Sequence, residues 1–181
     1  EEAEFSKVLE NIFRSVNIAL VNEMKLISEK LKINLNNVID AASTKPYGFM
    51  KFLPGPGIGG HCIPIDPYYL YWKAKSKGFD SKFIKLAGKT NILATEIISK
   101  KIINYFKKNK KTKILILGIS YKKNIEDVRE SPALQIIAKL KKVFKVDYSD
   151  PYVKKFPKTR RYKINLKSKN LKPEQLKKYD A

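Results

Sequence analysis

The apolar positions in the first part of the chain recur at helical spacing. Between Phe5 and Leu31 they fall three or four residues apart with no Gly or Pro inside, which predicts one long amphipathic helix. A cluster of asparagines precedes a short helical pattern over 35–42, and a longer pattern covers about 81–106. These patterns predict a helical first part of the chain.

Residues 43–67 break the helical pattern, because ten of them are Gly or Pro. Apolar residues lie between these glycines and prolines. Loops longer than about 12–15 residues in a compact domain are usually functional or disordered, and the apolar content here favours a packed, functional loop. At its end, Asp66 and Pro67 predict the N-cap and the first residue of a further helix that stops at Gly78.

The periodicity changes after a lysine-rich linker. The run Ile114–Gly118 is continuously apolar up to its glycine, which is typical of a buried parallel strand. The pair Ser131 and Pro132 then predicts the start of a helix, and residues 143–148 predict the next strand. Strand, loop, helix and strand form the repeating unit of a doubly wound α/β sheet.

We therefore predict an α + α/β fold class, with a helical domain over 1–111 followed by a partial Rossmann-like, doubly wound α/β domain over 112–181. Weaker signals in the second domain predict a strand near 162–166 and a short helix that begins at Pro173. Two strong strands and one helix are too few to cover both faces of a sheet. We expect this chain to be part of a longer protein.

The positive charge is concentrated in the second part of the chain. The whole sequence carries 38 Lys and Arg against 17 Asp and Glu, and residues 100–181 hold 25 of the basic residues and 7 of the acidic ones. Such a surplus suits nucleic acid, an anionic membrane or a phosphorylated small molecule. A basic nucleic-acid-binding module is thus one alternative, with Tyr105 and Phe156 among the aromatic residues between the lysines. We expect no nucleic-acid partner, because no known nucleic-acid-binding motif is present.

The single cysteine, Cys62, excludes an internal disulfide framework and a Cys-rich zinc site, so we expect no metal. Its isolation fits a reducing cytosol, and we expect a cytoplasmic protein. No run of about 18 apolar residues occurs, which predicts no membrane partner.

The loop over 43–67 also contains the glycine pattern of a dinucleotide site, at Gly55, Gly57 and Gly60. No strand precedes these glycines, and prolines follow where the crossover helix of such a site would start. We interpret them as a tight loop whose backbone N–H groups can approach an oxygen atom or a sugar closely.

A lone cysteine is ordinarily a small buried apolar residue, but the setting of Cys62 favours chemistry. It follows the glycine loop and precedes Asp66 by four residues, near a predicted helix start. A dyad with His61 is an alternative, although adjacent side chains usually point in different directions. On the first helix, Lys7 and Asn11 stand four residues apart and share a face; taken alone, both are ordinary surface residues.

The charged loop after the first predicted strand is the other candidate site. It contains Tyr121, Lys122, Asp127 and Arg129, and open α/β sheets bind ligands at this end of their strands. A helix start with Lys and Arg nearby suits a phosphate group. The alternative is a merely solvated loop.

Together these segments resemble the nucleotide-sugar 6-dehydrogenases, the family of UDP-glucose and UDP-N-acetylhexosamine dehydrogenases. Ser43–Phe49 and Pro54–Pro67 resemble its catalytic-cysteine loop, closest to the branch that acts on UDP-N-acetylglucosamine. Gly118–Lys122 and Asp127–Pro132 resemble the signature of its UDP-binding domain. Lys7, Asn11 and the Asn22-Glu23 pair also stand at the family's spacing, so that the resemblance spans nearly the whole chain.

The resemblance implies a parent enzyme built from an N-terminal Rossmann NAD domain, a helical central domain and a C-terminal UDP-binding domain. This chain would be a fragment that lacks the first domain and is inactive alone. The parent would use NAD to oxidise the C6 alcohol of a UDP-sugar twice, and UDP-N-acetylglucosamine is the predicted substrate. UDP-glucose and UDP-N-acetylmannosamine are the alternatives within the family. A homodimer through the central domain is also implied, and a dimerisation scaffold without catalysis is the remaining alternative.

The resemblance also assigns roles to residues. Cys62 would be the nucleophile that forms a thiohemiacetal and a thioester, Lys7 and Asn11 would stabilise the oxyanion and hold the attacking water, and Asp66 would help that water lose its proton. Arg129 would reach toward NAD. The residues implied to bind the substrate are Phe52, Leu53, Gly55, Gly57, Ile58, Gly59, Tyr121 and Lys122. Some family members carry an Arg near Pro46 and Tyr47 that reaches a neighbouring site, and no Arg is present there.

Overall fold

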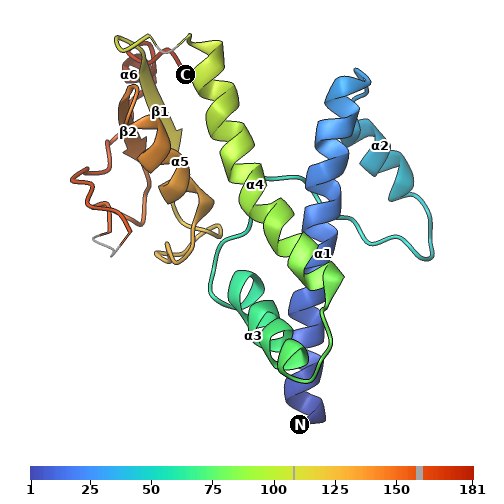
Figure 1. Ribbon diagram of the computed structural model, residues 1–181. Coiled ribbons are helices and arrows are strands. Elements are labelled where there is room, and N and C mark those ends of the chain that lie inside the picture. The colour runs from blue at the N-terminus through green and yellow to red at the C-terminus, as the bar shows by residue number, and fades with distance from the viewer. Residues whose placement is uncertain (108, 158–160) are drawn as a thin grey trace. The chain divides into compact units, whose positions relative to one another are not determined.

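The computed structural model describes residues 1–107, 109–157 and 161–181 (Figure 1). The chain divides into two compact units, Glu1–Ala94 and Thr95–Ala181. Among the described residues, no helix is long and apolar enough to span a lipid bilayer.

The first unit is helical, as the periodicity predicts. It contains α1 (Glu2–Lys30), α2 (Leu35–Ala42), α3 (Cys62–Ser76) and the first part of α4 (Lys82–Tyr105), joined by an irregular loop over 43–61. Figure 1 shows α3 lying beside the N-terminal half of α1, and the two helices pack together. Asn34 caps α2, since its side-chain oxygen accepts a hydrogen bond from the backbone N–H of Asn36.

The start of α3 differs from the prediction. The helix begins at Cys62, not at Asp66 and Pro67. Pro64 lies in its first turn, where a backbone N–H would have no helical partner, so a proline is tolerated there. Pro67 is buried within the helix and removes one further backbone donor. Both the cysteine and the aspartate therefore belong to the same helix, which ends just before Gly78 as predicted.

The second unit contains a two-stranded parallel sheet. Strand β1 (Lys113–Leu117) pairs with β2 (Lys145–Ser149), and α5 (Pro132–Leu140) connects them. The side chains of Ile114 and Val146 lie opposite each other, as do those of Ile116 and Tyr148. This parallel pair with its connecting helix confirms the predicted strand, helix and strand unit.

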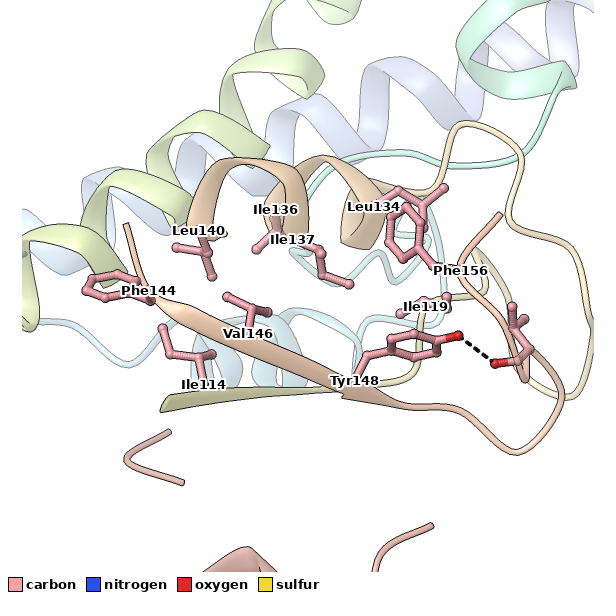
Figure 2. Close-up of a cluster of buried hydrophobic side chains, with 11 residues drawn as sticks. Ile114, Ile119, Leu134, Ile136, Ile137, Leu140, Phe144, Val146, Tyr148 and Phe156 are labelled. Atoms are coloured by element: carbon pink, nitrogen blue, oxygen red, sulfur yellow. Dashed lines mark hydrogen bonds between the residues drawn. The ribbon is translucent and has the colours of Figure 1, made fainter. Parts of the chain in front are cut away.

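The core of the second unit lies between the sheet and α5 (Figure 2). Ile137, Leu140 and Tyr148 are fully buried there, and the Tyr148 hydroxyl donates a hydrogen bond of 3.1 Å to the carbonyl of Val153. Apolar residues from the second part of α4, such as Ile98 and Ile102, pack against the same core. Part of α4 therefore belongs to the second unit.

The predicted strand near 162–166 does not form. An isolated antiparallel bridge joins Lys155 and Lys167 instead, and Tyr162, Ile164 and Leu166 lie partly buried against the core. Every second residue of this segment is apolar because one side of an irregular segment, and not of a strand, packs on the core. The short helix predicted to begin at Pro173 is present as α6 (Pro173–Leu176).

Candidate functional site

The side chain of Asn11 lies at the centre of a polar chain between α1 and α3. It is 1% exposed, and its Nδ2 donates a hydrogen bond of 2.9 Å to Oδ2 of Asp66. Its Oδ1 accepts a hydrogen bond of 2.8 Å from a terminal nitrogen of Arg14. The interpretation of Asn11 as a surface residue is thus wrong, because helical spacing alone does not show which face of α1 meets α3.

Arg14 was not singled out from the sequence. It follows Asn11 by one turn of α1, and its guanidinium also lies 3.5 Å from the carboxylate of Glu10. Its Nε is buried and has no hydrogen-bond partner among the residues that the structure describes. The sequence could have indicated this contact, because Arg14 follows Asn11 by three residues and side chains three or four apart in a helix are neighbours.

Cys62 and Asp66 share one face of α3. Cys62 is the first residue of the helix and its thiol is free and exposed, while Asp66 stands one turn further along. The hydrogen bond between Asp66 and Asn11 ties α3 to α1 one helical turn after Cys62. The structure therefore brings two of the four predicted catalytic residues, Asn11 and Asp66, into contact, with Cys62 one turn away on α3.

Lys7 is the fourth predicted catalytic residue and lies one turn before Asn11 on α1. Its side chain is 61% exposed, and its ammonium group lies 3.5 Å from the Glu10 carboxylate. The ammonium thus pairs with Glu10 and not with Asp66. An exposed, flexible lysine at this place leaves a mobile positive charge near the polar chain.

The glycine loop is tied to α1 at two points. The backbone N–H of Gly55 donates a hydrogen bond of 2.8 Å to Oδ1 of the buried Asn22, and the Phe52 ring packs edge-on against Phe13 with centroids 5.9 Å apart. Gly57 has a φ of 128°, which favours glycine. Among the described residues, no strand precedes this loop, as the sequence predicted, and a dinucleotide motif requires one.

A groove of about 730 Å³ lies between α1 and this loop. The predicted substrate residue Phe52 forms part of its wall, whereas Leu53 is 59% exposed and lies outside it. Gly55, Gly57, Ile58 and Gly59 are half-buried along the loop. The residues that line the groove are Ser6, Leu9, Glu10, Phe13, Arg14, Met50, Lys51 and Phe52.

In the second unit, Asp150 fixes the loop that follows β1. One carboxylate oxygen accepts from the backbone N–H groups of Ile119 and Ser120, at 2.8 and 3.4 Å, and the other accepts from Tyr152 and Val153. Burial alone would raise the pKa of Asp150, but these four donors outweigh it and hold the pKa below its ordinary value.

The predicted ligand residues of the second unit all lie on this loop. Tyr121 is 37% exposed and its backbone N–H donates to the carbonyl of Asp127, and Lys122 is exposed. The Arg129 guanidinium makes hydrogen bonds of 2.6 to 3.1 Å to the Asp127 carboxylate. These bonds hold the pKa of Asp127 below its ordinary value. Arg129, the residue predicted to reach NAD, is thus engaged by its own loop.

The described residues do not fit a complete NAD site. The β1 strand is followed by a long charged loop whose only glycine is Gly118, whereas a dinucleotide needs a tight glycine turn that lets the backbone approach the pyrophosphate. Within the part of the chain that the structure describes, no group of His, Cys, Asp and Glu side chains could hold a metal ion.

Two family models match the chain. Residues 1–92 match the central domain of the UDP-glucose/GDP-mannose dehydrogenase family, and residues 115–181 match the UDP-binding domain of the same family. The segment between the two matches holds the second part of α4, the linker and the start of β1.

Individual relatives agree with these matches. A UDP-N-acetyl-D-mannosamine dehydrogenase of Methanocaldococcus jannaschii is 40% identical over 85% of this chain and 35% of its own length. A UDP-N-acetyl-D-glucosamine 6-dehydrogenase of Salmonella typhi is 37% identical over 83% of this chain and 36% of its own length. The solved structure of a UDP-D-ManNAc dehydrogenase from Pyrococcus horikoshii has a TM-score of 0.78 and 34% identity over 88% of this chain and 38% of that one. The chain thus spans little more than a third of the length of these relatives.

Proposed function

Because the chain belongs to the UDP-glucose/GDP-mannose dehydrogenase family, we propose that it supplies the covalent and hydrolytic part of a UDP-N-acetylhexosamine 6-dehydrogenase. The observation that carries this proposal is the hydrogen bond from the buried Asn11 to Asp66, one turn after Cys62 on α3. It supports a nucleophile beside an amide donor and a carboxylate base, which is the combination that thioester formation and hydrolysis require.

The proposed substrate is a UDP-N-acetylhexosamine. The glycine loop resembles the branch acting on UDP-N-acetylglucosamine, and relatives named for both N-acetylglucosamine and N-acetylmannosamine support the N-acetylated class. Phe52 would contact the sugar, because it lines a groove beside the polar chain, and the resemblance adds the half-buried loop over 55–59 that follows it. Tyr121 and Lys122 would bind the uridine nucleotide through stacking and charge.

NAD would supply the acceptor for the two hydrides removed from C6, and it would be bound mainly by residues outside this chain. After the first oxidation, the Cys62 sulfur adds to the C6 aldehyde and forms a carbon–sulfur bond. The resulting thiohemiacetal keeps C6 in place for the second oxidation, which leaves a thioester on Cys62.

Asn11, Asp66 and Lys7 would act on the thioester. Asp66 accepts a proton from the attacking water, and the Asn11 amide donates to the oxygen on which negative charge develops. The Lys7 ammonium adds positive charge one turn away on α1. When the tetrahedral intermediate collapses, the carbon–sulfur bond breaks, and the uronate and the Cys62 thiol are released.

The proposal is tested in a chimera in which this chain replaces the matched region of the Methanocaldococcus jannaschii relative. We expect two NADH formed per UDP-N-acetylglucosamine or UDP-N-acetylmannosamine and a lower rate with UDP-glucose. Cys62→Ala should abolish uronate formation, whereas Ser76→Ala, at the far end of α3, should not. Normal turnover by Cys62→Ala, or no oxidation of any UDP-sugar by a folded chimera, would reject the proposal. The 181-residue chain alone should form no NADH.

We also propose that a second copy of the chain is a partner. Large apolar side chains of the first unit are exposed, among them Leu20 and Ile27 on α1 and Leu86 and Ile92 on α4, and such surfaces commonly mark association sites. Analytical ultracentrifugation of the chain should show a dimer, and Leu20→Glu should shift it to the monomer. A wild-type chain that stays monomeric at high concentration would contradict this.

A further inference from the structure

The hydrogen bonds at Asn11 include one residue, Arg14, to which no predicted role is assigned. From the Arg14 guanidinium it runs to Oδ1 of Asn11, and from Nδ2 of Asn11 to the carboxylate of Asp66, with lengths of 2.8 and 2.9 Å. A guanidinium is only a donor and a carboxylate is only an acceptor. The amide between them satisfies both neighbours in one orientation and neither in the flipped one.

From this geometry we infer that Arg14 is a positioning residue for the hydrolytic step, an inference that rests on the proposed function. Arg14 holds the amide oxygen of Asn11 away from Asp66, so that the amide nitrogen faces the carboxylate. That nitrogen carries a second hydrogen, which the inference assigns as the donor to the developing oxyanion. Without Arg14, only the Asp66 carboxylate holds the amide orientation, and the donor for the developing oxyanion is less firmly preset.

The position of Arg14 in the structure fits this role. Asn11 is buried, so its orientation is set by protein groups and not by bulk water. The guanidinium is itself restrained, because it also lies near Glu10 and its Nε is buried. It lines the groove that contains Phe52, the proposed sugar-contacting residue. Arg14 thus lies beside the proposed substrate while acting through Asn11.

The role predicts a specific kinetic pattern in the chimera described above. Arg14→Met should lower kcat by about 10- to 100-fold, the effect expected when a catalytic group is misplaced. KM should change little, and the Cys62 thioester should accumulate, detected by mass spectrometry of the intact protein during turnover. Arg14→Lys retains a charged donor and should recover part of kcat. Lys25→Met, which removes a cation paired with Glu29 further along α1 and outside the groove, is the matched control and should leave hydrolysis unchanged.

A second measurement needs no turnover. In the 181-residue chain, the side-chain amide of Asn11 should give two well-separated proton resonances in nitrogen-correlated NMR spectra, because its two hydrogens lie in different surroundings. Arg14→Met should shift and narrow that separation while the backbone resonances of α2 stay in place. Arg14→Lys should restore the separation in part.

The outcomes separate this inference from the proposed function. If Arg14→Met and Arg14→Lys hydrolyse the thioester at the wild-type rate and leave the Asn11 amide resonances unchanged, the inference is overturned. If Cys62→Ala in the chimera still produces uronate, the proposed function fails, and the NMR spectra still decide whether Arg14 orients Asn11. If Arg14→Met does not fold, Arg14→Lys and its amide resonances decide.

Discussion

Along α1 the first unit buries polar residues, Asn11, Ser15 and Asn22, whereas the second unit buries a continuous apolar cluster around Ile137 and Tyr148. The first arrangement places hydrogen-bonding groups where helices meet. In the second, hydrocarbon and the Tyr148 hydroxyl fill the space between the sheet and α5, and the buried Asp150 carboxylate lies just after β2. Buried polar groups need their partners in fixed positions. In the helical unit, buried polar contacts therefore orient the side chains of the candidate site, whereas the α/β unit is stabilised mainly by apolar packing.

The largest effect is expected from the apolar core. Ile137→Ala should lower the free energy of unfolding of the second unit by about 2–5 kcal/mol, since Ile137 is 0% exposed and truncation leaves a cavity. Hydrogen exchange of the amides in β1 and α5 measures the change. Leu117→Ala, at a position of the same unit that is 69% exposed, is the control and should change stability by less than about 0.5 kcal/mol. Equal effects of the two would contradict the role given to the core.

The next effect concerns the polar interior of the first unit. Asn11→Ala should destabilise that unit by about 1.5–3 kcal/mol, because it removes hydrogen bonds to two charged groups and leaves them without this partner. Hydrogen exchange of α1 and α3 reports it. Asn17→Ala, at an exposed hydrogen bond of the same helix, should have a much smaller effect. If both substitutions are equally mild, the buried amide does not hold the helices together.

The Asp150 carboxylate should make the stability of the second unit depend on pH. Because the folded pKa of Asp150 is lowered, its contribution to stability is present above the ordinary carboxyl pKa of about 3.9 and is lost as the pH falls through the folded value. Asp150→Asn should lower stability by about 1–3 kcal/mol at pH 7. It should also weaken the loss of stability on acidification.

Urea unfolding between pH 7 and pH 3 measures both effects of Asp150→Asn. Asp40→Asn, at an exposed carboxylate paired with Lys51, is the matched control and should leave the acid dependence unchanged. An unchanged acid dependence in Asp150→Asn would show that the buried carboxylate does not anchor the loop after β1.

The smallest effect concerns glycines in the two candidate sites. Gly118 has a φ of +80°, and no atom lies within 4 Å of the place that a Cβ would take, so Gly118→Ala should cost about 1–2 kcal/mol through backbone strain alone. Gly55 has equal space and no such φ, and Gly55→Ala should leave the thermal unfolding temperature nearly unchanged. A lower unfolding temperature in Gly55→Ala would mean that the first unit also depends on glycine there.

Most of the elements were predictable because their periods are long or their caps are clear. Helical spacing predicted α1 and α4, and the apolar run before Gly118 predicted β1. The start of α3 was not predictable from proline rules, since prolines are compatible with the first turn of a helix as well as with a loop. The strand near 162–166 failed because alternation also arises where an irregular segment packs on a core.

The sequence could predict which residues belong to the candidate site, but it could not predict the hydrogen bonds that join them. Cys62, Asp66 and Asn11 could be named from motifs, but the bond between Asn11 and Asp66 joins residues 55 apart in sequence. Arg14 was missed for the same reason: its importance depends on the orientation of an amide that only the packing of α1 on α3 defines. Sequence spacing predicts which residues share a face of one helix, but which faces of two helices pack together depends on the tertiary structure.

The exposed thiol of Cys62 also makes the chain a single-site reporter. It is the only cysteine in the sequence and it is free, so a maleimide dye or a spin label would attach at one defined position without any background substitution. The same exposure leaves the position open to oxidation to sulfenic and sulfinic acids. In a preparation stored without reductant, a growing fraction of molecules would thus lose the reactive thiol. Mass spectrometry of the intact protein would detect the added oxygen atoms while the fold stays unchanged.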